Sequence, residues 1–131
     1  MDSSRRDAAP VRGHRDLIVW QRGMQLVVEC YRLAKVLPSS ERYVLTDQLL
    51  RAAVSVPANI AEGHGRLSRS DFVRHLTIAR GSLGELDTFL EVTSEVGLLT
   101  TSRLARSSAL SDEVGRMLWA LIRKLGTRQL R

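Results

Sequence analysis

The sequence is poor in the residues that most often crosslink, anchor or activate a small protein. Its one cysteine, Cys30, excludes an internal disulfide, and its apolar helical neighbours predict a buried or half-buried thiol. No stretch approaches the roughly 18 to 20 uncharged apolar residues that span a bilayer. The basic N-terminus is not followed by the hydrophobic segment of a secretory signal. We therefore expect a cytoplasmic protein without a membrane segment.

Histidine is scarce as well, and the three histidines form no catalytic pattern. The paired Glu-x-x-His motif of di-iron bundles is absent. Glu62, His64 and His75 are the one combination that could converge on a metal across a turn. The segment 63–66 is glycine-rich, but it lacks the preceding strand and the Gly-Lys-Ser/Thr of a phosphate-binding loop. We predict no catalytic residues, no metal site and no cofactor.

Lysine is nearly missing, because 18 of the 20 basic residues are arginine, and the net charge is +6. Arginine suits bidentate contacts with phosphate, although a G+C-rich genome produces the same bias. The cations concentrate in residues 1–15, 66–80 and 116–131. Such clusters are compatible with a polyanionic partner and with an ordinary solvated surface. The residues that we predict to contact nucleic acid are Arg66, Arg69, Arg74, Arg116, Arg123, Lys124 and Arg128.

What the chain does contain is helical periodicity, with no alternating strand pattern. The expected helices cover about residues 16–37, 46–62, 68–97 and 100–126. Their short connections favour an all-α fold, an antiparallel up-down-up-down four-helix bundle. The bundle should occupy residues 16–126, between a disordered basic tail, 1–15, and a basic C-terminal tail, 127–131. In the first helix the expected apolar stripe is Leu17, Trp20, Met24, Val27, Tyr31 and Ala34.

The second helix, around which the chain is organised, has two distinct faces. One face is apolar and comprises Leu45, Leu49, Ala52, Val56 and Ile60. Pro57 lacks an N–H and crowds the carbonyl of Ala53, so we expect one helix kinked near Pro57 rather than a new helix beginning at Asn59.

The other face is polar and comprises Gln48, Arg51, Ser55, Asn59 and Glu62. Ser82 and Glu85 of the third helix can hydrogen-bond with it, and Gly81 and Gly84 beside them suggest a close backbone approach. A buried arginine needs a carboxylate partner, so Arg51 should pair with Glu62 or Glu85. This stripe is either an inter-helix network that fixes the register or part of an oligomer or ligand interface.

These residues carry a resemblance to a known family. Gln48, the segments 51–53 and 55–56, and the run Asn-Ile-Ala-Glu-Gly ending at Gly63 resemble the signature of the bacterial "four helix bundle protein" family. The later IARGSLGEL, residues 78–86, resembles its second motif, and Trp20 and Tyr31 match its first-helix aromatics. The match covers roughly Leu17 to Leu125. The structural or interface residues of this motif are Gln48, Arg51, Ser55, Asn59, Glu62, Gly63, Ser82 and Glu85.

The resemblance implies an oligomer and a set of partners. The family includes proteins encoded by intervening sequences of 23S rRNA genes and is related to the accessory variability determinant of diversity-generating retroelements. Its members form homopentamers, and the retroelement protein works with a reverse transcriptase and RNA. We therefore expect a non-catalytic homo-oligomer, a pentamer by resemblance, that binds RNA or DNA. The alternative is a protein-interaction scaffold that recruits a reverse transcriptase or a ribosomal partner.

Overall fold

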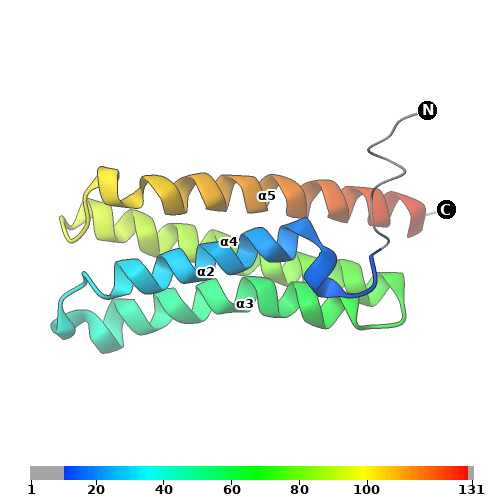
Figure 1. Cartoon of the computed structure of the whole chain (residues 1–131), viewed down its shortest axis with the longest axis horizontal. Coiled ribbons are helices and arrows are strands. Elements are labelled where there is room, and N and C mark those ends of the chain that lie inside the picture. Colours follow the sequence, from blue (N-terminus) through cyan, green and yellow to red (C-terminus); the bar gives the residue numbers. More distant parts are fainter. Residues whose placement is uncertain (1–10, 130–131) are drawn as a thin grey trace.

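Four long helices pack side by side in the computed structural model, which describes residues 11–129 and the side chains as far as Gly126 (Figure 1). They are α2(Ile18–Ala34), α3(Asp47–His64), α4(Arg69–Glu95) and α5(Thr101–Gln129). Two 3₁₀ turns, η1(His14–Asp16) and η2(Ser39–Glu41), and a π-helical turn, η3(Arg42–Thr46), complete the described part. No strand occurs within residues 11–129, and no helix there is long and apolar enough to cross a membrane. The predicted all-α four-helix bundle is confirmed.

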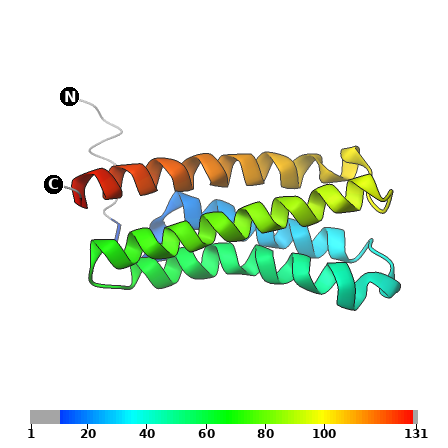
Figure 2. The ribbon, with the colours of Figure 1, turned by 180° about the vertical axis from the view of Figure 1, so that it is seen from behind.

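The helices follow one another around the bundle in chain order. Each contacts the next, and α5 returns to contact α2. Figure 2 shows α4 between its two sequence neighbours, and the α3–α4 contact is the most extensive in the molecule. The predicted apolar face of α3 is confirmed, since Leu45, Leu49, Ala52, Val56 and Ile60 are all buried in the shared core. The fully buried large side chains include Leu26, Leu49, Val56, Ile60, Leu76, Leu86, Val114 and Leu118.

The ends of α4 show why this helix starts and stops where the sequence predicts. Ser68 is its N-cap, and its hydroxyl accepts a hydrogen bond from the Asp71 N–H at 3.1 Å. At the other end Gly97 has a φ of +78°, a left-handed conformation that favours glycine. The N–H groups of Gly97 and Leu98 donate to the carbonyls of Ser94 and Thr93 at 3.1 and 2.8 Å. This pair of bonds is the Schellman motif, which satisfies the last carbonyls of the helix.

The predicted boundaries of the two tails need correction. Gly126 does not end the last helix, because α5 continues to Gln129. A single glycine costs a helix only about 1 kcal/mol relative to alanine, which the neighbouring good helix formers offset. At the other end of the chain η1 lies inside the predicted N-terminal tail. Residues 1–10 and 130–131 lie outside the described residues.

Pro57 lies in the interior of α3, which is a single helix from Asp47 to His64. The alternative of a new helix beginning at Asn59 is therefore wrong, while the kink stays a prediction. Pro57 is buried against α2, where a Cβ built on Gly23 would come within 3.6 Å of the Pro57 Cβ. The backbones of α2 and α3 thus approach each other closely at Gly23. Packing against this glycine provides a reason for a proline inside the helix.

The predicted apolar stripe of α2 is only partly correct: Leu17, Trp20 and Val27 pack half-buried against the core, whereas Met24 and Tyr31 are exposed. The side chains that α2 buries are Val19, Leu26, Cys30 and Leu33, together with Gly23 and Glu29. Met24, Val28 and Tyr31, which are 39%, 46% and 50% exposed, form instead an apolar stripe on the outside of the bundle. Apolar residues occur on nearly every side of this helix, so its neighbours α3 and α5, rather than its own pattern, determine which side is buried.

Candidate nucleic-acid interface

Basic residues from three separate segments meet at one end of the bundle. Because the helices alternate in direction, the start of α2, the α3–α4 connection and the end of α5 lie together, as Figure 1 shows at its right side. Within residues 11–16, 62–74 and 119–126, seven cations accompany three carboxylates. All seven are exposed: Arg12, Arg15, Arg66, Arg69, Arg74, Arg123 and Lys124. We call this set the basic end.

Some of these cations are held by carboxylates and others are not. Arg66 pairs with Glu62 at 3.0 Å, and Arg74 pairs with Asp71 at 3.8 Å. For Arg69, Arg123 and Lys124, the described residues provide no carboxylate within 4 Å. Surface pairs of this kind contribute little and exchange readily for another anion. The basic end therefore has both free and exchangeable positive charge.

Two of the predicted nucleic-acid contacts are not members of the basic end. Arg116 is exposed about three turns before the end of the described side chains of α5, where it lines a hollow between α4 and α5. Arg128 lies within α5, but its side chain is outside the described part of the structure. Five of the seven predicted residues are thus brought together, and one is displaced along the bundle.

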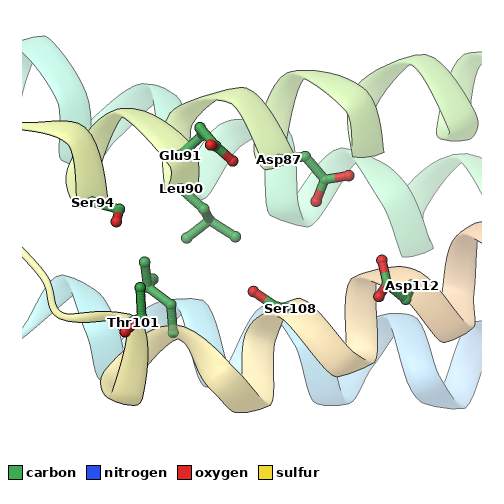
Figure 3. Close-up of a pocket in the computed structure, with 8 residues that line it drawn as sticks. Asp87, Leu90, Glu91, Ser94, Thr101, Ser108 and Asp112 are labelled. Atoms are coloured by element: carbon green, nitrogen blue, oxygen red, sulfur yellow. The ribbon is translucent and has the colours of Figure 1, made fainter.

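The half of the α4–α5 face that is farther from the basic end carries negative charge. A cavity of about 400 Å³ is lined there by carboxylates and hydroxyls, and Figure 3 shows Asp87 and Asp112 facing each other from the two helices. The Ser111 hydroxyl donates to Asp87. Burial raises the pKa of the Asp87 carboxyl above its usual value, the hydrogen bond from Ser111 opposes this shift, and the Asp112 charge adds to it. This half of the face therefore carries charge of the sign opposite to that of the basic end.

The polar stripe of α3 is smaller in the structure than the sequence suggests. Ser55 and Ser82 do connect α3 with α4, since their hydroxyl oxygens lie 2.8 Å apart. Arg51, however, is exposed and pairs with Asp47 at 3.8 Å, not with Glu62 or Glu85. At the surface an arginine needs no buried partner, because water solvates it.

The remaining members of the stripe face solvent. Gln48 donates to the carbonyl of Val44 at 2.9 Å within its own helical segment. Glu62 pairs with Arg66 across the end of α3, and Glu85 is exposed on α4. These residues do not form the predicted inter-helix network.

His75, which the sequence suggested only as a metal ligand with Glu62 and His64, is the α4 partner of Asn59. Its Nδ1 lies 3.1 Å from Oδ1 of Asn59, to which the ring N–H donates. Its Nε2 accepts from the Arg74 guanidinium at 3.2 Å, so the network reaches the basic end. His75 is 6% exposed, and a buried imidazole requires such partners. In the sequence, the position of Asn59 on the polar face of the second helix was the available signal for a polar partner on the next helix.

Gly63 belongs to the same contact. A Cβ at this position would lie 2.6 Å from the Cβ of His75 and 3.1 Å from the Phe72 ring. The Phe72 ring in turn packs edge-on against His64, with ring centroids 5.6 Å apart. The Asn59–Gly63 run is therefore the surface on which the start of α4 rests. Its role in the described structure is to position the two helices and, through His75, Arg74.

The described residues form neither a metal cluster nor a reactive thiol. No group of three His, Cys, Asp or Glu side chains there could hold a metal ion, so Glu62, His64 and His75 do not converge. Burial, followed by the charges of Glu29 and Asp87, raises the pKa of the Cys30 thiol to about 12, which keeps it protonated and unreactive near neutral pH. Glu29 is also buried, and it pairs with Arg32 at 3.1 Å and with Arg106 at 3.5 Å.

Comparison with known proteins supports the predicted family. A model described as "23S rRNA-intervening sequence protein" matches residues 15–120. A crystal structure from Bacteroides thetaiotaomicron, of a protein of unknown function from the S23 ribosomal protein family, is 28% identical. It superimposes with a TM-score of 0.74 over 79% of this chain and 97% of that one. No curated protein matches the sequence. A chain matched over most of its length, with the four helices and the Asn59–Gly63 contact described above, belongs to the 23S rRNA-intervening sequence protein family.

Proposed function

We propose that this protein is a non-catalytic homo-oligomer that binds the phosphate backbone of RNA or DNA through the basic end. The observation that carries the proposal is the meeting of three basic segments at one end of the bundle, where exposed cations outnumber carboxylates. Arginine there suits bidentate phosphate contacts. The intervening-sequence family and the related retroelement accessory proteins make an RNA partner the first to test.

The exposed stripe of α2 supports the oligomeric part of the proposal. Met24, Val28 and Tyr31 are large apolar residues one helical turn apart on the outside of the bundle. Contiguous apolar surface of this kind marks a protein contact more often than scattered single residues do. We take another copy of the chain as its partner, with a pentamer as the expectation from the family.

The test is a pair of double charge reversals that change the net charge equally. Arg123→Glu with Lys124→Glu alters the basic end, whereas Lys35→Glu with Arg103→Glu alters exposed cations at the opposite end of the bundle. Binding to a labelled RNA hairpin is followed by fluorescence anisotropy at about 50 and about 200 mM salt. Wild-type affinity should fall steeply with salt, and the first variant should lose tenfold or more while the control loses about twofold.

Two results would contradict the proposal. Absence of wild-type binding at about 50 mM salt, where phosphate contacts are strong, would exclude backbone recognition. Equal weakening by the two double variants would mean that binding follows net charge and not the basic end.

The second candidate is a scaffold that recruits a reverse transcriptase or a ribosomal partner, and the apolar stripe of α2 is the observation that favours it. A defined complex with such a protein that survives nuclease treatment, and that Val28→Glu abolishes, would support this function. The genomic neighbourhood distinguishes the intervening-sequence proteins from the retroelement accessory proteins. A position within a 23S rRNA gene indicates the intervening-sequence class, and a neighbouring reverse transcriptase indicates the retroelement class.

A further inference from the structure

A second hollow on the α4–α5 face lies between the acidic cavity and the basic end. Its volume is about 670 Å³, and its lining includes Gly81, Gly84, Gly115 and Trp119, with Arg80 and Arg116 at its edges. Trp119 is 47% exposed, a large apolar surface left open on a face that carries charge of both signs.

The glycines on the α4 side have no packing role within the chain. A Cβ built on Gly81 or Gly84 would meet nothing within 4 Å, so the predicted close approach of α3 to these residues is wrong. Each glycine costs an exposed helix about 1 kcal/mol relative to alanine. The missing side chains leave open space next to the Trp119 ring. A planar group needs this space to reach the indole.

The two arginines supply the positive charge of this hollow. The guanidinium carbon of Arg80 lies 4.7 Å from the centroid of the Trp119 ring, in a cation–π contact. Neither Arg80 nor Arg116 has a carboxylate within 4 Å among the described residues. The Arg80 guanidinium lies over one face of this half-exposed indole, and Arg116 lines the same hollow, a combination of aromatic ring and cations that is typical of a stacking platform for bases joined by phosphates.

The hollow and the basic end share one side of α5. Arg116, Trp119 and Arg123 are spaced by three and four residues, so they lie along one side of α5. In the opposite direction the lining reaches Asp87, which also borders the acidic cavity. A strand placed on Trp119 is therefore attracted along α5 toward Arg123 and repelled from Asp87.

We propose that this hollow is a subsite for one unpaired base of a single-stranded nucleic acid, with Trp119 as the stacking platform and Arg80 and Arg116 on the adjoining phosphates. The proposal rests on the proposed function and adds to it a preference for single-stranded over paired segments. In the competing arrangement a second copy of the chain covers Trp119, and the test includes it.

The test compares variant and wild type on three labelled probes with about 12 nucleotides per strand. These are a single-stranded oligouridine, a blunt duplex and an abasic oligonucleotide. Trp119→Ala should weaken binding of the single strand by roughly tenfold or more, because each base stacked on an aromatic ring contributes about 1 to 3 kcal/mol. Duplex and abasic binding should change less than about twofold, and Trp119→Phe should retain most of the single-strand affinity.

Gly84→Leu provides a second variant that keeps Trp119 and closes the hollow. Its side chain enters open space, so the bundle should keep its thermal stability while single-strand binding falls as in Trp119→Ala. A direct readout uses Trp20→Phe to leave Trp119 as the sole tryptophan. Oligouridine should then quench the fluorescence, and the abasic probe should not.

The possible failures are distinguishable. If Trp119→Ala leaves single-strand binding unchanged, or weakens all three probes alike, the stacking subsite is wrong and backbone binding by the basic end stands. If sedimentation shows that Trp119→Ala changes the oligomeric state, the hollow is a subunit contact and the subsite is wrong. If the wild type binds none of the three probes, both proposals fail.

Discussion

Asn59 contacts groups on two helices at once. Its Nδ2 donates to the carbonyl and the hydroxyl of Ser55 at 2.9 and 3.0 Å, and its Oδ1 accepts from His75. The side chain thus joins α3 to α4 at the point where the family motif lies.

We predict that Asn59→Ala lowers the free energy of unfolding by about 1 to 3 kcal/mol, because it leaves His75 buried without its acceptor. Urea denaturation measures the change. Gln48→Ala is the matched control, since Gln48 is exposed and contacts only its own helical segment, and it should stay within about 0.5 kcal/mol of wild type. A variant of Asn59 that keeps full stability yet no longer binds nucleic acid would make Asn59 a ligand contact instead.

At this scale the sequence placed Asn59 and Ser55 on the face that contacts the next helix, and it indicated the Ser82 partner of Ser55 but not the His75 partner of Asn59. Helical spacing placed both on a polar face, and the Ser55–Ser82 contact followed from facing stripes. His75 was missed because an isolated histidine on a helix has no pattern of its own. The predicted carboxylate partner of Arg51 was wrong, because spacing along a helix does not distinguish a buried position from one at the edge of the α3–α4 contact.

At the scale of helices, the α3–α4 pair uses glycine in two opposite ways. Gly63 lies where the two helices touch, and any side chain there would meet His75 and Phe72. Gly84 lies on the outer side of α4 and meets nothing. The same substitution should therefore have opposite effects at the two positions.

We predict that Gly63→Ala destabilises the bundle by about 1 to 3 kcal/mol through overpacking. Gly84→Ala should stabilise it by roughly 0.5 to 1 kcal/mol through higher helix propensity. Thermal unfolding of the two variants beside the wild type provides the comparison. Loss of stability in Gly84→Ala would indicate that another chain already packs on that glycine.

The helices differ in how far their packing follows from the sequence. On α3 and α4 polar residues alternate with apolar ones at helical spacing, so only one side is able to enter the core, and the prediction succeeds. On α2 apolar residues surround the helix, and the buried register depends on α3 and α5, which a local pattern does not contain. The hollow beside Trp119 is also a property of two helices together, although Arg116, Trp119 and Arg123 at three- and four-residue spacing are visible in the sequence.

At the scale of the whole molecule, the alternation of helix direction converts three distant basic clusters into one surface. The sequence predicts the basic clusters and the antiparallel topology separately. The two together imply that the clusters meet at one end of the bundle. Oligomerisation would multiply this charge, since five copies of a chain with a net charge of +6 carry about +30. Such a ring should bind phosphate backbones with a strong dependence on salt.

We predict that Val28→Glu reduces the oligomer to smaller species without unfolding the bundle, because Val28 is 46% exposed on the apolar stripe of α2. A buried contact between subunits does not accommodate an unpaired carboxylate. Size-exclusion chromatography with light scattering measures the mass, and circular dichroism checks the fold. Val54→Glu on α3, at 43% exposure, is the matched control and should keep the wild-type mass. Dissociation by Val54→Glu alone would move the contact to α3.

An even number of antiparallel helices returns the backbone to the side from which it started. The segment before α2 and the end of α5 consequently lie together at the basic end, as both views of the ribbon show. Any polypeptide joined beyond either of these segments is tethered within reach of that surface, where its effective concentration is in the millimolar range for a short flexible linker. An acidic extension would then act as a built-in competitor for phosphate, and a basic one would enlarge the footprint. A reporter fused instead within the 96–100 connection, at the far end of the bundle, would leave the binding surface unobstructed.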